Sequence, residues 1–183
     1  MDRGTDSMDR GGDSTALRLD GVDRRLLSMI HAYGDDPRVA ATARALSWSG
    51  EHGALWLAAG LAGAAVDRER RGAWLRASAL TATAHLASMA VKRIVRRPRP
   101  THVTPLVRTA GRHSFPSSHA ASAVAAAVAF GAPVAPVAAP LAAAMCLSRL
   151  VVGVHYPTDV AAGAALGAAA AGLGARWIGV RHG

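Results

Sequence analysis

Cysteine and aromatic residues are scarce in this chain of 183 residues. Cys146 is the only cysteine, so no disulfide can form within the chain. Aromatic residues make up 4% of a sequence that is 51% apolar, so the apolar content is mainly alanine, valine and leucine. A water-soluble core of alanine would bury little surface per residue, whereas helices in a membrane associate through small residues. The composition therefore favours packed membrane helices over a water-soluble globule.

Acidic residues are scarce as well, with 12 against 21 basic residues and a net charge of +9. A basic chain indicates an anionic partner, which can be nucleic acid, an anionic bilayer surface or a phosphate substrate. Seven of the 21 basic residues lie between Lys92 and Arg112, beside long apolar runs. This clustering indicates a local pocket or rim at a membrane and argues against a nucleic-acid partner.

The first part of the chain divides into a tail and a charged, partly apolar stretch. Residues 1–16 contain the tandem MDRGTDS-MDRGGDS, which is polar and lacks apolar periodicity, so we expect a disordered tail. Residues 17–47 mix apolar and charged positions, which predicts amphipathic helices at the membrane interface. Asp35, Asp36 and Pro37 interrupt this stretch and can start a second helix.

Residues 48–183 form the third region, which we expect to be the transmembrane domain. A membrane span needs roughly 20 residues. Of the five apolar segments in this region, the first (48–66) and the third (120–132) are therefore the weakest candidates for a span. Overall we predict an all-α, multi-pass bundle of about five transmembrane helices in the plasma membrane, and the distribution of lysine and arginine does not decide its orientation. The five apolar segments are 48–66, 74–95, 120–132, 134–154 and 160–180.

The last segment contains GAALG at Gly163–Gly167, a spacing typical of close helix contact. Packing within the bundle and a homodimer both account for this pattern.

The first cluster of candidate functional residues is KRIVRRPRP, from Lys92 to Pro100. Lys92 and Arg96 share a helix face, and such like charges destabilise an isolated helix. An anion among the side chains would relieve the repulsion, since arginine can donate to two oxygens of a phosphate and lysine supplies a compact charge. A polybasic patch for anionic lipid headgroups is an equally good interpretation of this stretch alone.

The second cluster is SFPSSHAAS, from Ser114 to Ser122. Pro116 and the two serines after it are typical of a helix start, where free N–H groups and the helix dipole attract anions. His119 would lie in the first turn of that helix. An ordinary capping turn with an interfacial histidine is the alternative.

The third cluster is SRLVVGVHYPTD, from Ser148 to Asp159. A carboxylate four residues after a histidine, here Asp159 after His155, can bind one ring nitrogen and raise the basicity of the other. Near phosphate-binding cations such as Arg149, this histidine would be an activated nucleophile. Taken alone, a histidine–aspartate pair that caps a helix explains the pattern slightly better.

The three clusters together resemble the type 2 phosphatidic acid phosphatase superfamily, which shares its site with vanadium haloperoxidases. The resemblance rests on K-x6-RP, PSxH and SR-x5-H-x3-D, read in this order between Lys92 and Asp159. The family usually has glycine where this chain has Ser118, a difference that concerns substrate fit more than activity. The matching positions are Lys92, Arg99, Pro100, Pro116, Ser117, Ser118, His119, Ser148, Arg149, His155 and Asp159.

The resemblance implies a helical bundle and a phosphatase that needs neither a metal nor a cofactor. His155, oriented by Asp159, would attack phosphorus, and His119 would protonate the leaving oxygen. The phosphate would be bound by Lys92, Arg99, Ser117, Ser118 and Arg149. Arg93, Arg96 and Arg97 match no family position, and we interpret them as headgroup contacts or solvated charge. His85 lies within an apolar segment, where a packing role beside Thr81, Thr83 and Ser88 is the better interpretation.

The short length and the alanine, arginine and glycine content are similar to those of small actinobacterial members of this superfamily. We therefore expect a lipid phosphate as substrate, with a polyprenyl diphosphate or decaprenylphosphoryl 5-phosphoribose favoured. Phosphatidylglycerophosphate or phosphatidic acid is the second choice. A non-catalytic protein that binds anionic lipids is the alternative from another class, although such a binder has no need of His119, His155 and Asp159 together.

Overall fold

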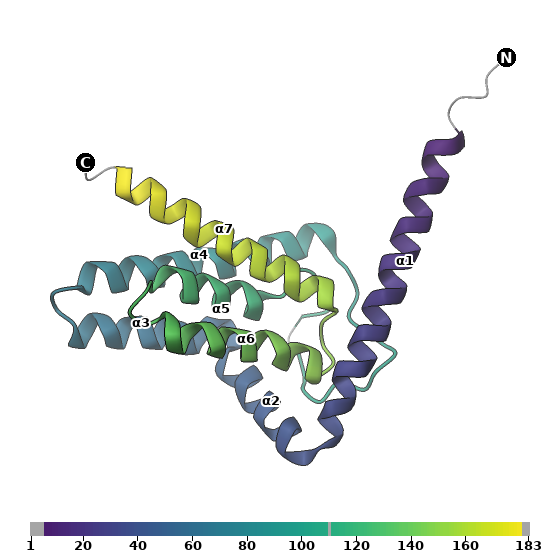
Figure 1. The fold of residues 1–183 in the computed structure, drawn as a ribbon, viewed down its shortest axis with the longest axis horizontal. Coiled ribbons are helices and arrows are strands. Elements are labelled where there is room, and N and C mark those ends of the chain that lie inside the picture. The colour runs from purple at the N-terminus through teal and green to yellow at the C-terminus, as the bar shows by residue number, and fades with distance from the viewer. Residues whose placement is uncertain (1–5, 110, 181–183) are drawn as a thin grey trace.

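The computed structural model of the protein describes residues 6–109 and 111–180 (Figure 1). Within these ranges the secondary structure is helical, with α-helices and two short 3-10 turns, and an isolated bridge pairs Pro98 with His113. The all-α prediction is therefore confirmed. Within the described ranges, no helix is both long and apolar enough to cross a membrane.

The N-terminal part consists of helix α1 (Asp6–His31), the turn η1 (Ala32–Asp35) and helix α2 (Pro37–Ser49). The side chain of Asp36 caps α2 by accepting from the backbone N–H of Arg38 at 2.7 Å. The predicted interruption at residues 35–37 is thus present. Helix α1 begins inside the stretch that we expected to be a disordered tail, of which residues 1–5 lie outside the described residues. Extending an existing helix needs no new nucleus, so α1 can continue into a polar sequence.

The first apolar segment, 48–66, is not one helix. Helix α2 ends at Ser49, the turn η2 spans Glu51–Gly53, and helix α3 covers Ala54–Val66. His52 and Gly53 have φ angles of 52° and 73°, which a continuous right-handed helix does not allow. Residues 48–53 therefore form a corner that places Glu51 and His52 beside the bundle end.

The other four apolar segments each correspond to one helix of the bundle. These are α4 (Arg71–Val95), α5 (Ser118–Ala129), α6 (Ala135–Val151) and α7 (Pro157–Val180). Figure 1 shows α3, α4, α5 and α6 side by side, with α7 across them and α1 leaving the bundle at a steep angle. Helix α5 is the central element, packed against α4, α6 and α7, and five of its alanines are fully buried: Ala120, Ala121, Ala123, Ala125 and Ala126.

Two glycines allow α7 to pack directly on α5. A Cβ atom on Gly163 would collide with the carbonyl oxygen of Ser117, and one on Gly167 would collide with that of Ala121. The small-residue spacing in this segment thus serves contact within the bundle, which was one of the two interpretations of the sequence. Because α5 and α7 both start at the same end, this packing also brings His119 near His155 and Asp159.

A long connection, residues 96–117, crosses that end of the bundle. Helix α4 ends at Val95, and the next residue, Arg96, has a φ of 52° that turns the chain away. The connection is fixed by backbone hydrogen bonds, from the Ser114 N–H to the Arg97 carbonyl at 2.8 Å and from the Leu106 N–H to the Val152 carbonyl at 3.0 Å. All three sequence clusters therefore meet at one end of the helices.

Candidate active site

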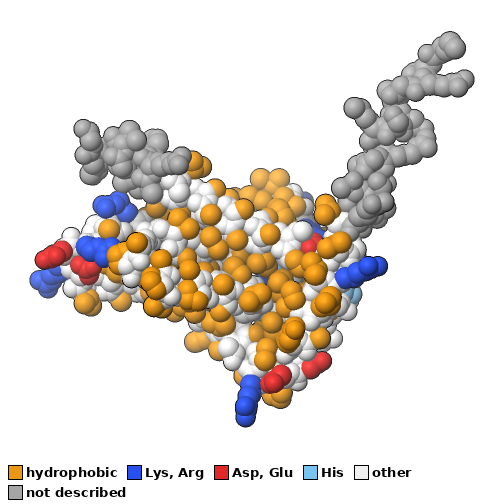
Figure 2. Space-filling view, viewed as in Figure 1, with side chains coloured by type: hydrophobic (Ala, Val, Ile, Leu, Met, Phe, Trp, Pro, Cys, Tyr) orange, Lys and Arg blue, Asp and Glu red, His pale blue; other side chains and the backbone are white. Residues whose placement is uncertain are grey.

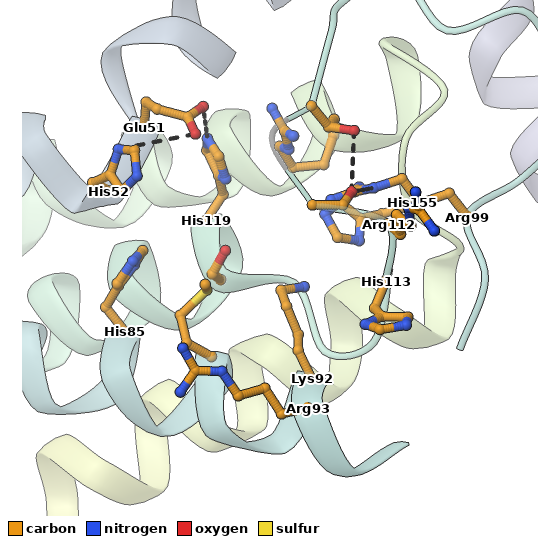
Figure 3. A pocket seen from close by; sticks show the side chains of 15 residues that line it. Glu51, His52, His85, Lys92, Arg93, Arg99, Arg112, His113, His119 and His155 are labelled. Carbon is orange, nitrogen blue, oxygen red and sulfur yellow. Dashed lines mark hydrogen bonds and ion pairs between the residues drawn. The ribbon is translucent and has the colours of Figure 1, made fainter. Parts of the chain in front are cut away.

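A cavity of about 180 Å³ lies at the end of the bundle where the three clusters meet (Figure 3). Six of the predicted site residues line it: Lys92, Arg99, Ser118, His119, Arg149 and His155. The two other predicted residues, Ser117 and Asp159, are fully buried behind the cavity wall.

His155 and Asp159 form a pair at the start of α7. The Nδ1 atom of His155 lies 3.6 Å from Oδ2 of Asp159, and both side chains are almost fully buried. Oδ2 also accepts from the backbone N–H of Tyr156 at 2.8 Å, and Oδ1 accepts from Arg97 at 2.9 Å. The carboxylate is therefore fixed on both oxygens and lies beside His155 Nδ1, which has no hydrogen-bond partner among the described residues.

Burial lowers the pKa of His155 well below its usual range, and the positive charges of Arg149, Arg99 and Lys92 lower it further. A hydrogen bond with the backbone of Ser114 raises this pKa, but the loss of water and the three cations outweigh it. The imidazole of His155 is thus neutral at neutral pH, which is the form that has a free lone pair for nucleophilic attack.

Three of the basic residues that line the cavity were predicted from the motifs, and each is anchored on backbone or hydroxyl groups; Arg93 and Arg112 line it as well. Lys92 donates to the carbonyl oxygens of Ser114 and Pro116. Arg99 donates to the carbonyls of Gly111 and Val154, both at 2.8 Å. Arg149 is 3% exposed and donates to the hydroxyl of Ser47. Its buried Nε has no hydrogen-bond partner among the described residues. Among the described residues, no carboxylate forms an ion pair with Lys92, Arg99 or Arg149, so the cavity suits a multiply charged anion.

The start of α5 supplies the remaining predicted residues. Ser117 caps the helix through its hydroxyl, which accepts from the Ala120 N–H at 3.4 Å, and its own N–H donates to the Asp159 carbonyl at 2.9 Å. Ser118 and His119 follow in the first turn and face the cavity. The ring of His119 is held by Nε2, 2.9 Å from the Ser47 carbonyl oxygen.

Our interpretation of Arg97 as headgroup contact or solvated charge is wrong. Its guanidinium donates to Asp159 and to Asp23 of α1, both at 2.9 Å, and stacks 4.1 Å above the ring of Tyr156. The sequence spacing gave no sign of this, because Asp23 lies 74 residues before Arg97 and Asp159 lies 62 residues after it. The sequence indicated a role for Arg97 only through its position inside the K-x6-RP motif.

A second part of the cavity was also missed, since the sequence motifs do not include it. Glu51, His52 and His85 line the cavity beyond His119, with Glu51 Oε2 at 3.9 Å from His119 Nε2 (Figure 3). The rings of His52 and His85 are 6.2 Å apart. The expected packing role of His85 is not what the structure shows. The nearby hydroxyls of Thr81 and Ser88 donate to carbonyls of their own helix, and the buried Nδ1 of His85 has no partner in the described part of the chain.

Comparison with known sequences gives one family. Residues 73–182 match the model of the PAP2 superfamily. The chain is 46% identical over 146 residues to the decaprenylphosphoryl-5-phosphoribose phosphatase of Mycolicibacterium smegmatis, covering 78% of this chain and 81% of that protein. It is 44% identical to the phosphatase of the same name from Mycobacterium tuberculosis, covering 78% of this chain and 82% of that one.

Two solved structures share the fold. The crystal structure of Aquifex aeolicus LpxE superposes with a TM-score of 0.69 at 19% identity, covering 83% of this chain and 93% of that one. A transmembrane PAP2 type phosphatidylglycerolphosphate phosphatase from Bacillus subtilis superposes with a TM-score of 0.58 at 23% identity, covering 88% and 94%. At such identities the likeness shows a common arrangement of helices.

Proposed function

The chain belongs to the PAP2 superfamily, and we propose that it is a membrane lipid phosphatase that removes the terminal phosphate of a sugar-linked prenyl phosphate. One observation carries the proposal. Among the residues that line one cavity are His119 of α5, His155 just before α7, and three cations of the motifs that form no ion pair with a carboxylate among the described residues. A headgroup patch can also contain cations that form no ion pair. Such a patch, however, has no need of a buried histidine beside a buried carboxylate.

In the proposed reaction, His155 is the nucleophile. Its free ring nitrogen attacks phosphorus, so that a P–N bond forms while the P–O bond to the leaving group breaks. His119 gives its proton to the departing oxygen, and Asp159 stabilises the positive charge that develops on the His155 ring. Water, deprotonated by His119, then attacks the phosphohistidine, releasing inorganic phosphate and restoring both histidines.

The cations supply the electrostatic part of the rate acceleration. Lys92, Arg99 and Arg149 would bind the non-bridging oxygens, together with the N-terminal backbone of α5 at Ser118. These groups are already in place because their own backbone and hydroxyl partners fix them. Ser117 contributes indirectly, by capping α5 and by joining it to α7 at Asp159.

The second part of the cavity favours a sugar as leaving group. Attack in line by His155 directs the leaving oxygen to the opposite side of the phosphate, toward His119, and beyond His119 lie Glu51, His52 and His85. A carboxylate and two imidazoles can bind hydroxyl groups of a sugar. The leaving group of a polyprenyl diphosphate is instead a negatively charged prenyl monophosphate, which Glu51 would repel. Of the two favoured substrates, this supports decaprenylphosphoryl 5-phosphoribose, the substrate that the names of the mycobacterial relatives state.

We also propose that the bundle lies in the plasma membrane, with about five membrane helices within residues 48–183. Apolar side chains are spread over its outer surface, as Figure 2 shows for one face of the bundle. In this proposal residues 17–47 lie at the interface and residues 1–16 precede them as a tail. The exposed apolar residues of the bundle include Leu61, Val66, Leu75, Leu86, Val128, Val137, Leu147 and Leu173.

Phosphate release from three lipids in detergent tests the proposal: decaprenylphosphoryl 5-phosphoribose, a polyprenyl diphosphate and phosphatidylglycerophosphate. We expect release from the first at the highest kcat/KM, and a loss of at least about 10³-fold in His155→Ala because the nucleophile is gone. Glu51→Gln should raise KM for the sugar-linked lipid. The ratio of its kcat/KM to that of the polyprenyl diphosphate should therefore decrease. Release from none of the lipids, or full activity of His155→Ala, would show that the proposed mechanism is wrong; preference for another lipid would overturn the substrate assignment alone.

A further inference from the structure

Arg97 connects the N-terminal helix α1 to the active site. One guanidinium nitrogen donates to Asp159 Oδ1 at 2.9 Å and to the Thr158 hydroxyl at 2.7 Å. The other donates to Asp23 at 2.9 Å and to Asp20 at 3.3 Å, both on α1. The side chain is 22% exposed, so these interactions are only partly screened by solvent.

Asp23 is the fixed point of this network on α1. It is 3% exposed, accepts from the Thr158 N–H at 3.0 Å, and also accepts from the Thr158 hydroxyl. One buried carboxylate thus binds both Arg97 and the residue that precedes Asp159. Such burial is costly for a charge that has no partner, so Asp23 and Arg97 depend on each other.

We infer that Asp23 and Arg97 are positioning residues for the reaction, which set the orientation of Asp159 and through it that of His155. The two oxygens of Asp159 have different partners. Oδ1 accepts from Arg97, whereas Oδ2 accepts from the Tyr156 N–H and faces His155. Without Arg97, the carboxylate is fixed only by the Tyr156 N–H at Oδ2, so it can turn about this contact and His155 loses part of its alignment. Helix α1 then helps to position the catalytic residues, although none of its described side chains lines the cavity.

The inference rests on the proposed phosphatase reaction and makes its own prediction about pH. His155 is faced by Lys92, Arg99 and Arg149 as cations and by Asp159 as an anion, and Asp159 is in turn paired with Arg97. Removing Arg97 leaves Asp159 with its full negative charge toward the imidazole. The proton affinity of His155 then increases, so the acidic limb of the rate profile moves to higher pH.

The experiment compares Arg97→Met with Arg96→Met, in the full chain in detergent, on the lipid of the panel that the wild type hydrolyses fastest. Arg96 is the adjacent residue, is exposed, and donates to the Arg93 carbonyl. In Arg97→Met we expect kcat to fall about 100-fold, because a catalytic group that is misplaced by about 1 Å loses activity on this scale. KM should stay within threefold of the wild-type value. Arg96→Met should stay within twofold of the wild type. Arg97→Lys keeps the charge, so its acidic limb should stay in place and its kcat should recover in part.

Asp23→Asn tests the α1 side of the network and should lower kcat about tenfold with KM unchanged. The double variant Asp23→Asn/Arg97→Met should be no slower than Arg97→Met, because both changes act through one contact. If Arg97→Met does not yield folded protein, the kcat values of Asp23→Asn and Arg97→Lys test the inference instead. Wild-type kcat and an unmoved acidic limb in Arg97→Met, or wild-type kcat in both Asp23→Asn and Arg97→Lys, overturn the inference. A wild type that releases no phosphate from the panel would contradict the proposed function instead.

Discussion

The charge on His155 decides whether the proposed nucleophile is available. Burial, and then Arg149, Arg99 and Lys92, lower the pKa of this histidine well below its usual range. Since a lowered pKa favours the deprotonated form, the ring should remain neutral while the pH falls through 6.5, the ordinary value for histidine. Only at lower pH should it gain a proton and lose its nucleophilic lone pair.

Nitrogen NMR of histidine-labelled protein in detergent, without phosphate, measures this directly. We expect the ring signals of His155, identified by their loss in His155→Gln, to be those of a neutral imidazole at both pH 7.5 and pH 6.0. A signal that titrates with a midpoint near 6.5 would contradict the effect that we assign to burial and the three cations.

The candidate site residues follow from the sequence to the extent that local spacing defines them. The four-residue separation of His155 and Asp159 is short enough for one helix turn to bring them together, and their side chains do lie 3.6 Å apart. Arg97 could not be interpreted in this way, because its two carboxylate partners come from distant parts of the chain. Glu51 and His52 join the cavity through a corner of the backbone that no apolar pattern predicts.

At the scale of helices, the contact of α5 with α7 determines the distance between His119 and His155, the two histidines of the proposed mechanism. Gly163→Ala places a methyl group against the Ser117 carbonyl, so α7 must shift and the bond between the Ser117 N–H and Asp159 lengthens. Gly172→Ala on the same helix is a matched control, since its added methyl group meets nothing within 4 Å.

We expect Gly163→Ala to destabilise the protein by about 1–3 kcal/mol, as overpacking does, and to lower kcat. Gly172→Ala should be neutral or stabilising by up to about 1 kcal/mol, because alanine favours helix over glycine. Thermal unfolding in detergent, with phosphate release at a temperature where both variants are folded, measures the two effects. Equal behaviour of the two variants would exclude a tight α5–α7 contact at residue 163.

Helix positions were predicted well where the apolar runs are long and uninterrupted. The segment 74–95 corresponds to α4, with the same last residue and a start three residues earlier, at Arg71. The prediction of one helix over 48–66 was wrong because mean hydropathy averages over the polar residues Glu51 and His52. The backbone turns at these residues and divides the segment between two helices. The positive φ angles at His52 and Gly53 become visible only in the structure.

For the whole molecule, the distribution of polarity along the helix axes links fold to function. The turn between α3 and α4 carries Arg68, Glu69, Arg70 and Arg71, and the opposite end carries the cationic cavity. Between these charged ends, the outer surface of the bundle is largely apolar, as Figure 2 shows for one face. A lipid substrate in a bilayer would have its charged headgroup at the level of one such end, where Lys92, Arg99 and Arg149 lie.

This distribution makes a prediction about the intact protein, expressed without any fusion partner. If the apolar surface contacts lipid, the chain should sediment with membranes, resist extraction by alkaline carbonate and require detergent for release, because transferring this surface to water costs roughly 25 cal/mol per Å². Charged substitutions on this surface, such as Leu86→Glu with Leu147→Glu, should weaken membrane retention, since both leucines are more than half exposed. Arg68→Glu, in the charged turn between α3 and α4, is the control and should leave retention unchanged. Recovery of the wild type in the carbonate supernatant would exclude an embedded bundle. The cationic cavity would then have to bind a substrate presented at the bilayer surface.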